Sequence, residues 1–134
     1  MTLFVDSSGF IAVLDECDSH HKAASGVWQE ALRSREPLLT SNYVVAESAA
    51  VVQRKYGMTG LRNLLQGLLP AVTVAWVSLD EHNTAIAAAL SADRRGLSLV
   101  DCISFEVMLR LGLRRALTVD QHFAEQGFDL AHLG

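Results

Sequence analysis

The stretch LFVDSSGF, residues 3–10, indicates the fold most directly. Its apolar residues Leu3, Phe4 and Val5 form a short run that is typical of a strand buried on both faces. Polar residues at positions 6–8 interrupt this run, and residues 10–14 then continue as one or two turns of helix. The stretch therefore predicts a buried strand that leads into a helix through a short loop.

The rest of the chain repeats this alternation of strand and helix. Short apolar runs predict further strands at residues 37–40, 72–77 and 115–119, with a candidate fifth strand at residues 129–133. Helical spacing predicts helices at residues 20–35, 43–56, 59–69, 80–95 and 99–111, the second of which ends at Gly57. Such alternation predicts an α/β fold with three α/β/α layers and a central parallel sheet of four to five strands.

Length and composition restrict the class of protein. The chain has 134 residues, of which 50% are hydrophobic and 19% charged, so we expect one globular domain over residues 1–134. Its net charge of −4 argues against a general nucleic-acid coating protein but allows a focused nucleic-acid site. The N-terminus lacks the basic region of a signal peptide, and no stretch predicts a membrane helix. We therefore expect a cytoplasmic protein with no membrane partner.

Two acidic residues directly follow predicted strands. Asp6 follows the first strand and Asp120 follows the fourth. In open parallel sheets, ligands bind beyond the carboxyl ends of the strands, so both carboxylates are expected at the binding edge. Each residue alone is also explained as a turn or helix-cap residue.

A third carboxylate lies within an apolar stripe of a predicted helix. Glu47 has Val44, Ala50 and Val51 as its neighbours at i−3, i+3 and i+4. Burial of a lone ionised carboxylate is costly, so this group must be paired, protonated or bound to a metal. No Lys or Arg precedes Arg54 in this helix, which leaves a partner from another segment as the alternative to a metal.

A fourth carboxylate opens a helix near the end of the chain. Asp101 is followed by Phe105 and Met108 at i+4 and i+7, so it begins an inward-facing row. The alternative is a first-turn acid that stabilises the helix dipole. A parallel sheet would bring all four acids to one end, where their mutual repulsion is usually relieved by Mg²⁺ or Mn²⁺.

Charge and neighbouring hydroxyls are consistent with a phosphate-processing metal site. The chain has 15 acidic and 11 basic residues, so its net charge equals that of the four acids. Metals held by carboxylates commonly serve phosphate chemistry. Ser7 and Thr118 flank the acids and could hold water, metal or phosphate, although a helix cap and a strand Thr explain them equally well.

Four motifs together resemble one known family. They are VDSS at residues 5–8, the segment 40–47 that leads to Glu47, LSLVD at 97–101 and TVDQHF at 118–123. In combination and order they resemble the PIN-domain ribonucleases, and specifically the VapC-type toxins of bacterial toxin–antitoxin pairs. The resemblance covers nearly the whole chain and implies a metal-dependent endoribonuclease that dimerises and is inhibited by a cognate antitoxin.

The resemblance also implies roles for individual residues. Asp6, Glu47, Asp101 and Asp120 match the acidic quartet, and hydrolysis by an activated water requires no side-chain nucleophile. The implied accessory polar residues are Ser7, Thr118 and Ser104. Candidate contacts to RNA at the rim of the site are Arg94, Arg95, Arg114 and Arg115, for which a solvated helix end is the alternative. His122 is interpreted as a structural or capping residue.

Other classes of protein fit less well. Haloacid-dehalogenase-type phosphatases need a second Asp at position 8, which is Ser here, and receiver domains need a late Lys, whereas the chain has only Lys22 and Lys55. A non-catalytic partner- or RNA-binding module remains an alternative, as does a free-standing PIN nuclease without an antitoxin. The apolar residues that could line the interface of such a module are Trp28, Leu64, Leu65, Leu68 and Leu69.

Overall fold

A five-stranded parallel sheet forms the centre of the computed structural model, which describes residues 1–131. The strand order is β3-β2-β1-β4-β5, and all four pairings are parallel, as the alternating pattern predicts. The predicted fifth strand is present but ends at residue 130; residues 132 and 133 of that prediction lie outside the described residues. The strands are β1 (Leu3–Val5), β2 (Leu38–Ser41), β3 (Val72–Ala75), β4 (Arg115–Leu117) and β5 (Asp129–Leu130).

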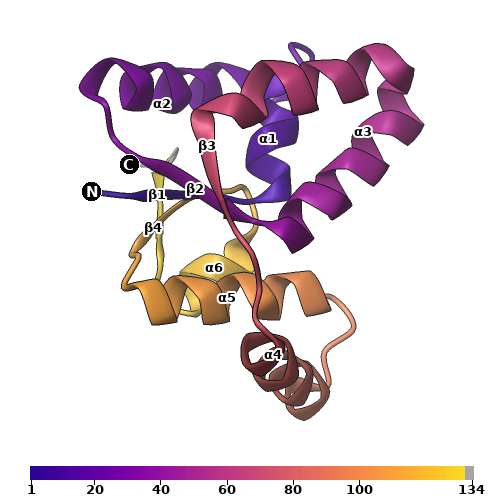
Figure 1. Ribbon diagram of the computed structural model, residues 1–134, viewed down its shortest axis with the longest axis vertical. Helices are drawn as coiled ribbons and strands as arrows, with labels where there is room; N and C mark the ends of the chain where they lie inside the picture. Colours follow the sequence, from indigo (N-terminus) through magenta and orange to yellow (C-terminus); the bar gives the residue numbers. More distant parts are fainter. Residues whose placement is uncertain (132–134) are drawn as a thin grey trace.

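Helices cover both faces of this sheet. In Figure 1, α1 and α2 lie on one side of the strands and α5 and α6 on the other, while α4 packs against α5. This arrangement confirms the predicted three-layer α/β/α fold. The helices are α1 (Ser7–Leu14), α2 (His21–Ser34), α3 (Asn42–Arg62), α4 (Leu79–Ala92), α5 (Leu99–Leu111) and α6 (Gln121–Glu125), with a π-helical turn η1 (Asn63–Leu68) and a 3₁₀ turn η2 (Leu69–Ala71).

One predicted helix end is confirmed, and one helix is new. Although α3 extends to residue 62, Gly57 has the non-helical angles φ 69° and ψ −160° and separates two helical segments, as predicted for a helix that ends at Gly57. Glycine reaches this conformation without a steric penalty because it has no Cβ. Helix α6 was not expected, because its five residues are too few to show a helical period.

The core packs on both faces of the central strand. Every residue of β1 is fully buried, which confirms the prediction from its apolar run. On one face Phe10 of α1 packs against Trp28 of α2, and on the other Phe105 packs edge-on against Phe123 at 4.9 Å between ring centroids. These contacts join α1 to α2 and α5 to α6, and Phe123 also lies 6.5 Å from the ring of Phe4 in β1. Both α1 and α6 begin next to the candidate site.

Most of the apolar residues considered above as an interface belong to this core. Trp28 and Leu64 are buried, and Leu68 and Leu69 pack against the core, whereas Leu65 is exposed. Two of these five side chains are buried and two are partly buried, which leaves little of the set for a partner. Among residues 1–131, no helix is both long and apolar enough to cross a membrane.

The order of the strands places a switch point between β1 and β4. From β1 the chain proceeds outward through β2 to β3, and then returns to β4 and β5 on the other side. Val5 pairs with Leu117, and the N–H of Asp6 donates to the carbonyl of Leu117 at 3.2 Å. The segments that follow β1 and β4 therefore leave the sheet side by side, which is where open α/β sheets bind their ligands.

Candidate metal centre

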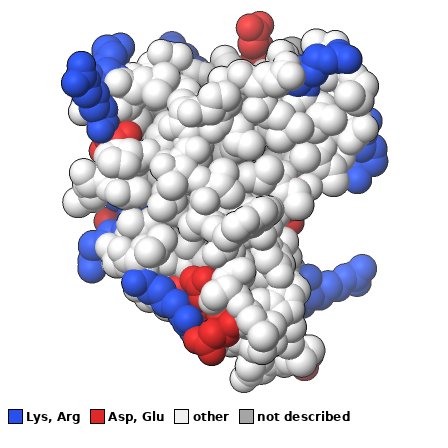
Figure 2. Space-filling view, viewed as in Figure 1, with Lys and Arg blue, Asp and Glu red and all other residues white. Residues whose placement is uncertain are grey.

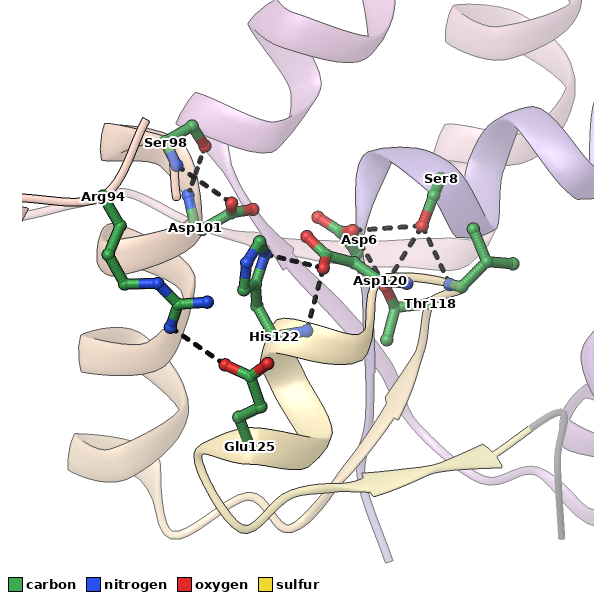
Figure 3. Close-up of polar contacts among 10 residues, drawn as sticks. Asp6, Ser8, Arg94, Ser98, Asp101, Thr118, Asp120, His122 and Glu125 are labelled. Atoms are coloured by element: carbon green, nitrogen blue, oxygen red, sulfur yellow. Dashed lines mark hydrogen bonds and ion pairs between the residues drawn. The ribbon is translucent and has the colours of Figure 1, made fainter. Parts of the chain in front are cut away.

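The four acids predicted from the sequence gather at this edge. Asp6 directly follows β1 and Asp120 precedes α6, while Glu47 lies in α3 and Asp101 in the first turn of α5. Figure 3 shows the side chains of Asp6, Asp101 and Asp120 directed toward one another. Asp101 interacts electrostatically with each of the other three, but the ligand atoms that lie within 4.8 Å of one another belong to Asp101, Asp120 and His122 and not to Asp6 or Glu47.

Asp6 is buried between two hydroxyl groups. Its side chain is only 3% exposed, and its Oδ2 accepts hydrogen bonds from Thr118 Oγ1 at 3.0 Å and from Ser8 Oγ at 3.1 Å. Burial raises the pKa of Asp6 to about 6, the negative charge of Asp101 adds to this rise, and the hydrogen bond from Thr118 opposes it. The carboxylate is therefore poorly stabilised as an anion in the absence of a cation.

Thr118 and Ser8 connect the segments that follow β1 and β4. Thr118 Oγ1 accepts the N–H of Asp120 at 3.0 Å while it donates to Asp6. Ser8 Oγ accepts the N–H of Val119 at 3.0 Å and lies 3.1 Å from Thr118 Oγ1. This network fixes the backbone of Asp120 relative to the carboxylate of Asp6 (Figure 3).

Glu47 is half-buried and is held by Ser7. Ser7 Oγ donates to Glu47 Oε1 at 2.6 Å, which connects α1 to α3. The fully buried row of α3 consists of Val44, Ser48 and Val52, whereas Ala50 is exposed. Glu47 therefore lies beside the buried row and not within it as predicted, because Ser48 is buried although it is polar.

Asp101 combines a helix cap with a place in the acidic cluster. Its Oδ2 accepts the N–H of Ser98 at 3.1 Å, and its own N–H donates to Ser98 Oγ at 3.0 Å, which completes a capping box. Burial raises the pKa of Asp101, and the charges of Asp120 and Glu47 raise it further. Asp101 is therefore both a first-turn acid of α5 and a member of the acidic cluster, so the two interpretations from the sequence do not exclude each other.

Asp120 caps α6 and contacts a histidine. Its Oδ1 accepts the backbone N–H of His122 at 2.9 Å. The ring Nδ1 of His122 lies 2.9 Å from the same oxygen, yet this buried nitrogen has no hydrogen-bond partner. Ligand atoms of Asp101, Asp120 and His122 all lie within 4.8 Å of one another, as a shared metal ion requires.

The donor set fits a hard divalent cation. The ion pairs of residues 1–131 join no Lys or Arg to any acid of the quartet, and the ring of His122, 2.9 Å from Asp120 Oδ1, is the basic group in ion-pair contact with it. Carboxylate oxygens are the ligands that Mg²⁺ and Mn²⁺ prefer. Nδ1 of His122, which has no hydrogen-bond partner, is a further ligand atom in the same cluster.

Comparison with known proteins identifies the family. The family model described as PIN domain matches residues 3–129. The chain belongs to the PIN-domain family. It is 30% identical over 128 residues to the 23S rRNA-specific endonuclease VapC20 of Mycobacterium tuberculosis, in two strains, and the match covers 94% of this chain and 95% of VapC20.

Solved structures agree with this assignment. The crystal structure of Mycobacterium tuberculosis VapC20, described as a Sarcin-Ricin loop cleaving toxin, superimposes with a TM-score of 0.82 at 29% identity, over 94% of this chain and 95% of VapC20. VapBC2 from Rickettsia felis, bound to a promoter DNA fragment, superimposes with a TM-score of 0.72 at 13% identity over 97% of each chain and supports the fold. The resemblance stated from the four motifs is therefore confirmed.

The accessory polar residues of this PIN domain occupy different environments. Ser7 and Thr118 contact acids of the quartet directly. Ser104 is buried, and its hydroxyl donates to the carbonyl of Val100 at 3.0 Å, within its own helix. The hydrogen bond of the Ser104 side chain therefore lies within α5 and involves none of the four acids.

The four arginines do not share one rim. Arg94 forms an ion pair with Glu125 at 3.0 Å and lies with Arg95 in the connection between α4 and α5, close in sequence to Ser98. Arg114 and Arg115 are at the start of β4, whereas the acids follow the other end of the strands, so their predicted position at the rim is wrong.

An open cavity adjoins Glu47 on the surface of the PIN domain. Its volume is about 450 Å³, and it is lined by Asn42, Tyr43, Ala46, Glu47 and Val100. Figure 2 shows the molecule hollowed between α3 and the connection from α4 to α5, with basic side chains projecting beside the hollow. This shape leaves the acidic edge accessible to a large ligand.

Sequence reasoning assigned no metal- or acid-contacting role to three residues of the site. Ser8 and Ser98 hold Asp6 and Asp101, and His122 lies within the acidic cluster. Ser98 stands three residues before an acid, which is the spacing of a capping box. The motif that contains Asp120 also contains His122, but the direction of its ring depends on α6, which the sequence did not reveal.

Proposed function

We propose that this PIN domain is a metal-dependent endoribonuclease and the toxin component of a toxin–antitoxin pair. The observation that carries the proposal is the convergence of four carboxylates at the switch point of the sheet, with no Lys or Arg in ion pairs with them in the described part of the chain. The raised pKa values of Asp6 and Asp101 indicate a cluster arranged for a cation. The relationship to an endonuclease toxin supports the same reaction.

The quartet would hold the metal ion, and neighbouring polar groups hold the quartet. Asp6, Glu47, Asp101 and Asp120 are the proposed ligands for Mg²⁺ or Mn²⁺. When bound, such an ion neutralises phosphate oxygens and makes water a stronger nucleophile near neutral pH.

Each acid is positioned by a contact of its own. Thr118 and Ser8 fix the Asp6 carboxylate, and Ser7 orients Glu47 by a short hydrogen bond. The capping box with Ser98 fixes Asp101, and the N-cap of α6 fixes Asp120. These contacts restrict the acids before substrate arrives, which lowers the entropic cost of the reaction.

Binding of RNA requires local positive charge, because the net charge of the chain is −4. Arg94 and Arg95 lie in the connection that leads to Ser98 and Asp101. Figure 3 shows Arg94 on the side of the molecule that carries the acids. We propose that they contact the phosphate backbone. The description of VapC20 as acting on 23S rRNA makes ribosomal RNA the first substrate class to test.

The proposed partners follow from the family. We propose a homodimer in the cytoplasm and a protein antitoxin that covers the acidic edge. A non-catalytic binding module and a free-standing nuclease are the outcomes that the experiment below separates from this proposal.

The test is cleavage of RNA by purified protein. A 23S rRNA fragment that contains the sarcin–ricin loop and an unrelated structured RNA are incubated with Mg²⁺, Mn²⁺ or EDTA. We expect discrete fragments with either metal, none in EDTA, and none with Asp101→Asn. RNA retained without fragments would indicate the binding module, and equal cleavage by Asp101→Asn would contradict the assigned site. Neutralisation of cleavage by the protein encoded next to the gene would distinguish a toxin from a free-standing nuclease.

A further inference from the structure

We propose that His122 is an imidazole ligand of the metal ion that Asp101 and Asp120 hold, and that it gives this site a preference for Mn²⁺ over Mg²⁺. The inference rests on the proposed metal-dependent function and adds a nitrogen donor to its carboxylates. It concerns one side chain that the sequence presented only as a structural or capping residue.

The first observation is an orphaned donor. Nδ1 of His122 is buried and has no hydrogen-bond partner, although buried polar groups in folded proteins are nearly always paired. It lies 2.9 Å from Asp120 Oδ1, yet without the alignment of a hydrogen bond. The same carboxylate oxygen already accepts the backbone N–H of His122. The ring and the carboxylate are thus in ion-pair contact but form no hydrogen bond.

The second observation is that this spacing suits a bridging cation. Two adjacent ligand atoms of an octahedral ion, each about 2.1 Å from the metal, lie about 3 Å apart. The separation of Nδ1 and Oδ1 is 2.9 Å, and an oxygen of Asp101 completes a set within 4.8 Å. A cation between these atoms would use the Nδ1 lone pair and neutralise the carboxylates together.

The third observation is that independent contacts hold two of the three donors, Asp101 and Asp120. Asp101 is fixed by Ser98, and the backbone of Asp120 is fixed by Thr118. Figure 3 shows the His122 ring between the side chains of Asp101 and Asp120, above the Arg94–Glu125 pair. A preformed set of donors on different elements is typical of a binding site, because little freedom is lost when the ligand arrives.

The chemical consequence is selectivity between metals. Mg²⁺ prefers oxygen ligands and keeps several waters, whereas imidazole suits transition-metal ions better. Mn²⁺ accepts both carboxylate and imidazole donors and is therefore the appropriate probe. We expect His122→Gln, which replaces the ring nitrogen by an amide, to weaken Mn²⁺ binding at least about tenfold and Mg²⁺ binding much less.

The experiment is pulsed EPR of Mn²⁺ bound to the full chain, together with titrations of Mn²⁺ and Mg²⁺. Wild type should show the coupling of a directly bound nitrogen, and His122→Gln should lose it. His20→Gln, at an exposed histidine before α2, is the matched control and should keep the coupling. Thermal unfolding in EDTA verifies that each variant is folded.

Each outcome decides a different claim. Bound Mn²⁺ without nitrogen coupling in wild type, or coupling that persists in His122→Gln, would overturn the role of His122 and leave the proposed nuclease intact. Failure of wild type to bind Mn²⁺ at all would overturn both this inference and the metal-dependent function. Loss of the coupling in His122→Gln alone, with the Mn²⁺ preference reduced, is the supporting result.

Discussion

The carboxylate of Asp6 shows most clearly that the site lowers the stability of the metal-free protein. Its carboxylate is buried, hydroxyl groups are its side-chain hydrogen-bond partners, and the nearby charge of Asp101 is of the same sign. Burial of an ionised carboxylate is unfavourable unless a cation compensates it. The residue is therefore suited to binding and contributes little to stability as an anion.

The unfavourable free energy of burying the ionised Asp6 carboxylate should be visible in the pH dependence of stability. The folded-state pKa of Asp6, about 6, is above its ordinary value of 3.8, so folding takes up a proton between these values. The unfolding free energy of the metal-free protein should therefore fall as pH rises from about 4 to 6 and then level off.

Asp6→Asn should lose this component of the pH dependence. In urea denaturation with EDTA at pH 7, the variant should be as stable as wild type or more stable, by at most about 3 kcal/mol. A variant that is less stable than wild type at pH 7, with no relative change between pH 4 and 7, would show that Asp6 is an ordinary structural residue.

Thr118 and Ser104 are both buried hydroxyl residues, but only Thr118 connects two acids. Thr118→Val removes the donor to Asp6 and the acceptor for the Asp120 N–H, and should destabilise the protein by about 1–3 kcal/mol and weaken Mn²⁺ binding. Ser104→Ala removes a hydrogen bond within α5 and should leave Mn²⁺ binding unchanged. Chemical denaturation and metal titration of both variants measure these effects, and equal metal affinities would contradict the role of Thr118.

At the scale of elements, close packing of α1 against β4 positions the site. A Cβ added at Gly9 would lie 2.2 Å from the carbonyl oxygen of Leu117, the residue that precedes Thr118. Only a residue without a side chain allows this approach, because backbone atoms cannot move aside as a flexible side chain can. The approach brings Ser8 within hydrogen-bonding distance of Thr118.

Gly9→Ala should therefore separate α1 from β4 and destabilise the protein by on the order of 3 kcal/mol. The matched control is Gly26→Ala in α2, where an added Cβ meets nothing within 4 Å. This control should stabilise the helix by about 0.5–1 kcal/mol. Thermal and urea unfolding of the two variants provide the comparison, and similar effects of both would contradict the packing argument.

The elements also show how far the sequence could predict the structure. Strand β1 and the acids that follow β1 and β4 could be predicted from the sequence. A buried strand is a short apolar run, and a strand end is marked by the polar residues that follow it, so both are visible in the local sequence. The buried row of α3 was misplaced, since a hydrophobic pattern does not reveal that Ser48 is buried. The position of His122 depends on α6, which is too short for periodicity, and on its packing, which is not local in sequence.

At the scale of the whole molecule, charge is distributed unevenly between the two ends of the sheet. The acids and the Arg94–Arg95 segment lie on the side where β1 and β4 end, and Arg114 and Arg115 lie where β4 begins. Arg115 is also paired with Glu36 at 2.9 Å. A polyanion that reaches the acidic edge should therefore meet Arg95 and not Arg114.

A comparison of two exposed arginines tests whether RNA binds at this end of the sheet and not at the other. Arg95→Ala should weaken RNA binding in EDTA and reduce the salt dependence of binding by about 0.7 in the slope of log affinity against log salt. Arg114→Ala should change neither quantity. Fluorescence anisotropy across a range of salt concentrations measures both, and equal losses in the two variants would contradict the proposed path of the RNA.

The central claim is that four carboxylates from separate segments share a divalent cation. Thermal unfolding of wild type and Asp101→Asn, each in EDTA and in saturating Mn²⁺, tests it most directly. We predict that Mn²⁺ raises the melting temperature of wild type by on the order of 10 °C. Asp101→Asn should be as stable as wild type in EDTA and respond far less to the metal. The claim would be contradicted if Mn²⁺ did not change the melting temperature of wild type and if Asp101→Asn melted at a much lower temperature than wild type in EDTA.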